Sequence, residues 1–137
     1  MNSIYNASAL LGRIFLVALY VWSGVSKIGN FAFFERYSAT HGVSAFLLVI
    51  SVIVELAGSL LLLVGYRTRI VALVLAGYTM VALLLFYGIH PTGMSNQIIA
   101  FAELAAAGGF LMLAACGAGG WSVDSWLDRG RARPVRA

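Results

Sequence analysis

Four ionisable side chains lie inside long apolar runs of the sequence, where a charge is costly. Arg13 and Lys27 fall in the first run, Glu55 falls in the second and Glu103 falls in the fourth. Such a group in the middle of a membrane-spanning helix costs roughly 2.5–3.5 kcal/mol on insertion scales, so it needs a charged partner, water or a proton. Two interpretations stay open: the four side chains fix how the helices pack, or they build a polar pocket.

The polar residues of the first run share one helical face. Arg13, Tyr20 and Lys27 recur every seven residues, which brings them to one side of an α-helix. A rise of about 1.5 Å per residue places Arg13 within reach of Glu55. The same rise places Lys27 and Glu103 nearer the other side of the membrane. We therefore expect Arg13 to pair with Glu55. We expect Lys27 to pair with Glu103, directly or through water.

The elements that carry these residues are four apolar windows, each about as long as the roughly 20 residues that a membrane-spanning helix needs. The sequence contains 61% hydrophobic and 10% charged residues, whereas soluble domains carry roughly a quarter charged residues. Glycine-rich or proline-containing breaks separate the windows. We predict an all-α, integral membrane four-helix bundle that forms a single membrane domain, with helices at about 9–28, 43–64, 70–89 and 97–116.

The distribution of basic residues predicts the orientation of this bundle. Cytoplasmic loops carry an excess of Lys and Arg, and four spans place both termini and the middle connection on one side. We therefore expect both termini, including a basic tail over 117–137, to be cytoplasmic. The net charge of +4 is concentrated in that tail, which favours contact with anionic lipid over nucleic acid. One side carries Arg13, Arg67, Arg69, Arg129, Arg131, Arg133 and Arg136, and the other carries Lys27 and Arg36.

A ligand site is expected in the outer half of the bundle, where polar groups converge beside aromatic surface. The connection 29–42 carries Phe34 and Tyr37 at helical spacing and is expected to lie at the outer membrane interface, over this site. A quinone head needs a flat apolar slot with one or two hydrogen-bond donors at its carbonyls. We predict that a quinone or other small aromatic molecule binds at Tyr20, Trp22, Ser23, Lys27, His90 and Glu103.

The residue types give little support for disulfide, haem or metal chemistry. The single cysteine, Cys116, excludes an intrachain disulfide and a Cys-x-x-Cys pair. His41 and His90 fall in connections or at a helix end, whereas a b-type haem would want two histidines facing each other between helices. These histidines and Glu35 lack a spacing that is diagnostic of a metal. We expect no metal site and no built-in cofactor.

The order of short motifs along the chain resembles the DoxX family of small bacterial membrane proteins. The resemblance runs from about Leu10 to Asp124, and the order and spacing of its motifs carry it. The motifs are Gly12-Arg13, Trp22 to Lys27, Phe31 and Phe34, Glu55 to Gly58, Leu61 to Gly65, Thr68-Arg69 and Gly120 to Asp124.

The resemblance implies a four-helix bundle in the bacterial inner membrane and an association with redox physiology. Some relatives are subunits of thiosulfate:quinone oxidoreductases, and others accompany enzymes that handle quinones, catechols or oxidative stress. Carried over by position, the residues that this family tends to show are Arg13, Lys27, Glu55 and Arg69. The segment from His90 to Gly93 and the acidic Glu103 depart from the general pattern of the family, and we expect them to belong to a subgroup.

Three functional hypotheses stay open, and the sequence does not decide whether the protein is an enzyme. The first is a redox-associated subunit that binds a quinone or small aromatic molecule, with electrons from a redox protein partner or from the bound substrate. The second is a non-enzymatic accessory or scaffold subunit of a membrane complex. The third is a small-solute transporter acting as a dimer, because four helices are few for alternating access. Ala105 and Gly109 form a small-xxx-small pair that suits a homo-oligomer or packing inside one bundle.

Overall fold

The computed structural model describes residues 2–131, and this part of the chain is helical without strands. Residues 1 and 132–137 lie outside the described residues, and with them Arg133 and Arg136 of the predicted basic tail. The helices are α1 (Asn2–Gly29), α2 (Phe31–Thr40), α3 (Ala45–Val64), α4 (Thr68–Phe86), α5 (Met94–Cys116) and α6 (Val123–Arg131).

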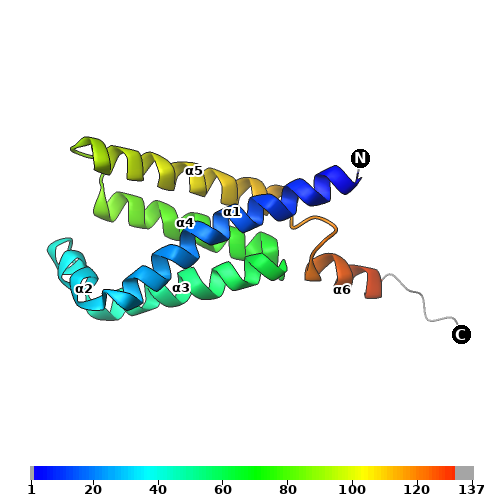
Figure 1. The fold of residues 1–137 in the computed structure, drawn as a ribbon, viewed down its shortest axis with the longest axis horizontal. Coiled ribbons are helices and arrows are strands. Elements are labelled where there is room, and N and C mark those ends of the chain that lie inside the picture. Colours follow the sequence, from blue (N-terminus) through cyan, green and yellow to red (C-terminus); the bar gives the residue numbers. More distant parts are fainter. Residues whose placement is uncertain (1, 132–137) are drawn as a thin grey trace, which may run out of the picture.

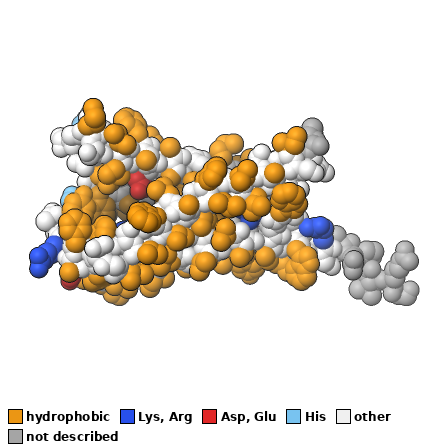
Figure 2. All heavy atoms as spheres, viewed as in Figure 1, with side chains coloured by type: hydrophobic (Ala, Val, Ile, Leu, Met, Phe, Trp, Pro, Cys, Tyr) orange, Lys and Arg blue, Asp and Glu red, His pale blue; other side chains and the backbone are white. Residues whose placement is uncertain are grey.

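Four of these helices, α1, α3, α4 and α5, are long and apolar enough to cross a membrane. Figure 1 shows them side by side, with α2 at one end of the bundle and α6 at the other. Figure 2 shows that hydrophobic side chains cover the length of the bundle between these two ends. Lipid makes such outward apolar surface favourable, and helices satisfy their backbone groups internally. The predicted all-α, four-helix membrane bundle is confirmed.

The helix boundaries follow local capping signals. The side chain of Ser44 accepts a hydrogen bond from the backbone N–H of Leu47 at the start of α3. Gly65 ends α3 in the left-handed conformation, at φ +71°. The window predicted at 70–89 ends early, at Phe86, because Gly88 turns the chain at φ +65° before Pro91. The window predicted at 97–116 begins early, at Met94.

Two connections contain more structure than an extended linker. The segment predicted at the outer interface, 29–42, contains α2, which packs against α1 and α3. The segment predicted as a tail, 117–137, contains the helix α6. The described part of this tail is therefore folded, and hydrogen bonds of Asp124 to the turn between α3 and α4 hold it at one end of the bundle.

The core of the bundle is built where α1 crosses its neighbours. Tyr20 and Phe110 meet edge to face with ring centroids 5.1 Å apart, which joins α1 to α5. Gly24 lets α1 approach α3 closely, since a Cβ at this position would lie 2.8 Å from a methyl carbon of Leu56. These contacts set the register of α1 against α3 and α5, and that register decides which polar groups meet.

Candidate functional site

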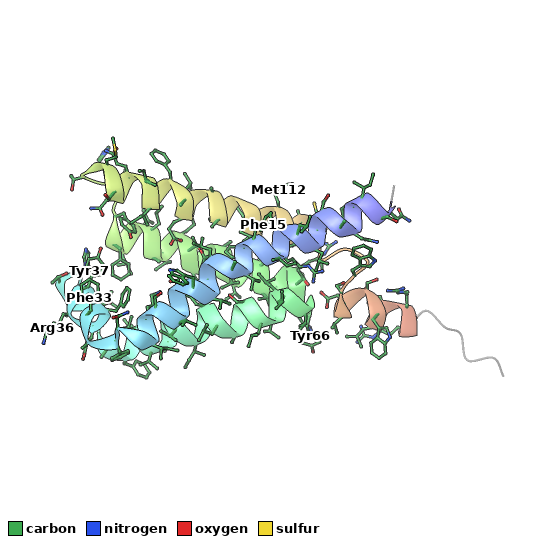
Figure 3. All side chains as sticks on the ribbon, in the orientation of Figure 1. Phe15, Phe33, Arg36, Tyr37, Tyr66 and Met112 are labelled. Atoms are coloured by element: carbon green, nitrogen blue, oxygen red, sulfur yellow. The ribbon has the colours of Figure 1, made fainter. Side chains whose placement is uncertain are left out.

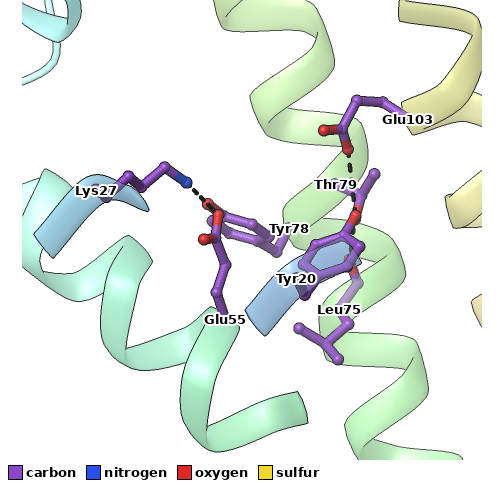
Figure 4. A network of polar contacts seen from close by, with 7 residues as sticks. All are labelled: Tyr20, Lys27, Glu55, Leu75, Tyr78, Thr79 and Glu103. Carbon is purple, nitrogen blue, oxygen red and sulfur yellow. Dashed lines mark hydrogen bonds and ion pairs between the residues drawn. The ribbon is translucent and has the colours of Figure 1, made fainter. Parts of the chain in front are cut away.

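A buried carboxylate joins three of the membrane-spanning helices. Lys27 of α1 forms an ion pair with Oε1 of Glu55 on α3, and the hydroxyl of Tyr78 on α4 donates to the same oxygen (Figure 4). Glu55 is only 2% exposed, and its second oxygen, Oε2, has no hydrogen-bond partner among the described residues. Glu55 is therefore a buried carboxylate with one paired oxygen and one oxygen that is free to accept a further hydrogen bond.

A second group of polar side chains lies beside the first. The hydroxyl of Tyr20 on α1 lies 2.5 Å from Oγ1 of Thr79 on α4 and 3.2 Å from Oε2 of Glu103 on α5 (Figure 4). Thr79 in turn donates to the backbone carbonyl of Leu75, at 2.7 Å. Because Thr79 uses its proton there, the Tyr20 hydroxyl donates to Thr79. Tyr20 is also the donor to Glu103, so its single proton faces two acceptors, Oγ1 of Thr79 and Oε2 of Glu103.

Aromatic rings close the end of the bundle at which α2 lies. Tyr37 of α2 stacks on Phe86, the last residue of α4, with centroids 5.7 Å apart. His41 packs against both rings, and Phe33 stacks on Tyr37 from the other side. Figure 3 shows Phe33 and Tyr37 projecting from α2 at this end. The cluster ties α2 to α4 across the end of the bundle.

The predicted pairing of Arg13 with Glu55 is wrong. Arg13 is fully buried, and its guanidinium donates to the backbone carbonyls of Leu62 and Leu63 at 3.3 and 3.2 Å and of Trp121 at 2.6 Å. Leu62 lies about two helical turns beyond Glu55. At this register Arg13 meets carbonyls of the last turn of α3, where a cation is favoured.

The direct pairing predicted between Lys27 and Glu103 is also wrong. Lys27 reaches across to α3, the antiparallel neighbour of α1, and takes Glu55 as its partner. Glu103 instead contacts Tyr20, two turns earlier on α1. The close approach of α1 to α3 at Gly24 explains why Lys27 turns to α3.

The structure brings together only some of the predicted ligand residues. Tyr20, Lys27 and Glu103 belong to the two polar groups, and Ser23 is half-buried on α1. Trp22 is 75% exposed, so its ring lies on the outer surface of α1 and away from these groups. His90 is exposed in the connection between α4 and α5. Neither residue takes part in the hydrogen bonds of the two polar groups.

Sequence reasoning missed Tyr78 and Thr79, which connect the two polar groups through α4. A signal for them existed, because these two hydroxyls are adjacent in an otherwise apolar window. Hydroxyl groups in a membrane-spanning helix form hydrogen bonds to neighbouring helices. Like the charged residues, these hydroxyls need partners inside the bundle.

A separate junction forms at the end of the bundle at which α6 lies. The carboxylate of Asp124 accepts hydrogen bonds from the backbone N–H groups of Arg67 and Thr68 at 2.7 and 2.8 Å, so it caps the start of α4. The N–H of Asp124 donates to the carbonyl of Gly65 at 2.9 Å. Asn6 of α1 accepts from the N–H of Gly120 at 2.6 Å. These bonds hold α6 against the bundle.

Two cavities among the described residues lie at this junction. The larger has a volume of about 790 Å³ and lies between the start of α4, the linker after α5 and α6. Among the described residues, no three His, Cys, Asp or Glu side chains gather as ligands of a metal would. The arrangement therefore offers two places for chemistry: the buried polar groups of the bundle and the basic cavity beside α6.

Comparison with known proteins finds a family of membrane proteins. The model of the DoxX family matches residues 8–88. The inner membrane protein YqjF of Escherichia coli (strain K12) is 33% identical over 94% of this chain and 98% of its own length. The inner membrane protein YphA of the same organism is 29% identical over 84% of this chain and 86% of its own length. No solved structure matches the chain.

Proposed function

The chain belongs to the DoxX family and is a multi-pass inner-membrane protein, and from that premise we propose that it is a redox-associated subunit that binds a quinone or another small aromatic molecule. The site lies in the half of the bundle nearer α2, at Lys27, Glu55 and Tyr78, with Tyr20 and Glu103 beside them. The observation that carries the proposal is Oε2 of Glu55, a buried acceptor that has no partner among the described residues and lies next to the partly buried ammonium group of Lys27.

The chemistry of this constellation suits a ring that carries oxygen substituents. A quinone carbonyl accepts a charge-assisted hydrogen bond from Lys27. A quinol or catechol hydroxyl donates to the free oxygen of Glu55. A ligand that exchanges between these two forms therefore finds a partner at the site in either state.

The bundle geometry supports entry from the membrane. The α1–α3 pair and the α4–α5 pair diverge toward the end at which α2 lies (Figure 1). Figure 2 shows an acidic side chain at the wall of a hollow between these two pairs. Glu103 of α5 is half-buried and meets Tyr20 of α1, so it lies between the two pairs. A lipid-soluble aromatic molecule would enter here and gain apolar burial beside hydrogen-bonding groups.

Proton supply is the role that this chain's own side chains would play. Reduction of a quinone to a quinol takes two electrons and two protons. Glu55 and Glu103 are carboxyl groups that can carry protons, and the hydroxyls of Tyr78 and Tyr20 contact them directly. The electrons would come from a redox protein partner.

Titration of a soluble quinone analogue into the purified protein tests the proposal. We expect the parent to bind, and the Lys27→Met and Glu55→Gln variants to bind about tenfold more weakly or worse, because each loses a hydrogen bond to a charged group. Trp22→Phe is the matched control, since this ring lies outside the polar groups. Isothermal calorimetry in a neutral detergent measures the affinities.

Two results of this titration would reject the site. If the parent does not bind the analogue, the accessory-subunit hypothesis becomes the better account of the polar groups, as a device that fixes helix packing. If the parent, the two variants and the control all bind equally, the analogue occupies some other surface.

A further inference from the structure

The cavity beside α6 is a basic groove of about 790 Å³. Its walls come from the turn between α3 and α4, the first turn of α4, the linker after α5 and α6 itself. The charged residues of these walls are Arg67, Arg69, Asp124, Asp128, Arg129 and Arg131. Four guanidinium groups and two carboxylates leave the lining with an excess of positive charge.

The groove lies at the level of lipid headgroups. α3 ends at Val64, α4 begins at Thr68 and α5 ends at Cys116, so three membrane-spanning helices terminate at this end of the bundle. Trp121 and Trp126 are exposed beside the groove, in the linker and on α6. Exposed tryptophans are typical of the membrane–water interface. Apolar side chains of the lining, such as Ile70 and Leu127, continue from this level toward the acyl chains.

The positive charge of the groove is not consumed by the protein itself. The carboxylate of Asp124 is engaged by the N–H groups at the start of α4. Within the described residues, none of the four arginines of the groove takes part in a salt bridge. Arg129 donates to the backbone carbonyls of Ser125 and Gly120 at 3.2 Å, which positions its guanidinium and leaves a further donor nitrogen.

An orphan hydroxyl provides a second, independent sign of a ligand. Thr68 lines the groove and is fully buried, yet its Oγ1 has no hydrogen-bond partner among the described residues. Buried hydroxyls are normally satisfied, so an unpartnered one in the wall of a cavity indicates that an outside group completes it. An oxygen-rich anion would accept from the arginines, and the wall at Thr68 would have to open slightly for its hydroxyl to join them.

We infer that this groove binds the phosphate of an anionic phospholipid headgroup. The arginines hold the phosphate oxygens, and the small and apolar residues of the linker and α6 accommodate the glycerol and the first carbons of the chains. The bound lipid joins α6 to the start of α4 and fixes this face of the protein at the membrane surface. Basic pockets between membrane helices at the headgroup level bind such lipids in general.

Native mass spectrometry of the full chain tests this inference. The protein is extracted from phosphatidylcholine nanodiscs that contain increasing phosphatidylglycerol, and the retained lipid is counted. We expect the parent to retain phosphatidylglycerol in preference to phosphatidylcholine. We expect the Arg69→Gln/Arg129→Gln variant to retain at least about tenfold less, the loss that follows when charge-assisted hydrogen bonds are removed. Arg36→Gln, exposed on α2 at the opposite end, is the matched control and retains the parent's level.

Three outcomes would overturn the inference. The first is a parent that retains the two lipids equally. The second is a double variant that retains phosphatidylglycerol like the parent, and Arg131→Gln, at the exposed end of α6, repeats this comparison if the double variant does not fold. The third is displacement of the lipid by millimolar inorganic phosphate or glycerol phosphate, because the occupant would then be a soluble phosphate compound.

Discussion

At the scale of single residues, the buried carboxylate of Glu55 is the point on which the polar groups of the bundle depend. One of its oxygens receives both the ammonium group of Lys27 and the hydroxyl of Tyr78. A buried ion pair gains little over an apolar pair of the same shape, but a stranded partner is costly. The stability of the bundle should therefore respond to the loss of one partner far more than to the loss of both.

We predict that Glu55→Ala destabilises the protein by about 3–5 kcal/mol, because Lys27 and Tyr78 lose their acceptor in a buried position. Lys27→Met should have a comparable effect, since it strands Glu55. The double variant should lose clearly less than the sum of the two. Denaturant unfolding in detergent, arranged as a double-mutant cycle, measures this coupling. Additive losses would show that the two side chains do not stabilise each other.

Glu103 should respond differently to the loss of its carboxyl. The hydroxyl of Tyr20 donates to Glu103, and the amide oxygen of a glutamine can accept the same hydrogen bond. We predict that the free energy of unfolding of Glu103→Gln lies within about 0.5 kcal/mol of the parent's value, the range of substitutions that break no contact. Glu55→Gln, which removes the charge opposite Lys27, should be clearly less stable in the same assay. A loss of stability as large for Glu103→Gln would show that the charge of Glu103, and not only its acceptor oxygen, stabilises the bundle.

At the scale of elements, the junction between the α3–α4 turn and α6 explains why scattered motifs matter together. Arg13, Gly65 and Asp124 belong to different motifs of the chain, and their contacts meet at the end of α3. Gly65 is the tightest point, because its backbone is left-handed and a Cβ would lie 2.5 Å from both Nη1 of Arg13 and Cβ of Ser122. This junction builds the end of the bundle that carries the basic groove.

We predict that Gly65→Ala destabilises the protein by at least about 1–2 kcal/mol, the cost of the left-handed conformation for a side chain, and more where Arg13 must move. Gly77→Ala on α4 is the matched control, since nothing lies within 4 Å of a Cβ there and its backbone is helical. Thermal unfolding in detergent compares the two variants. Equal midpoints would mean that the close contacts at Gly65 relax without cost.

At the scale of the whole molecule, the bundle has two chemically different ends. The start of α1, the α3–α4 turn and α6 lie at one end, and α2 and the α4–α5 connection lie at the other (Figure 1). The first end carries most of the described arginines, and the second carries the aromatic cluster of α2 and α4. The two ends therefore suit the two sides of an inner membrane.

We predict that the end with α6 faces the cytoplasm, because basic residues are retained on that side. Reporter domains fused after Ala137 and within the connection at Thr92 test the orientation. The reporter after Ala137 should be active in the cytoplasm and the one at Thr92 should be active outside it. The reverse pattern would invert the molecule and place the basic groove at the outer surface.

The sequence by itself determined the class of this protein, because hydrophobic length and the scarcity of charge leave lipid as the only suitable solvent for four such helices. Helical periodicity also identified Tyr20 and Lys27 as neighbours on one buried face of α1. Both are properties of single segments, so a linear pattern contains them.

Only the tertiary structure decided which partner each polar group takes. Periodicity places a side chain on a face, but the depth at which two helices cross is set by packing, as at Gly24 against Leu56. A shift of two turns separates the predicted partner of Arg13, Glu55, from the carbonyls that it binds. The folding of α6 onto the bundle likewise depends on backbone groups of the α3–α4 turn, which have no signature in the sequence.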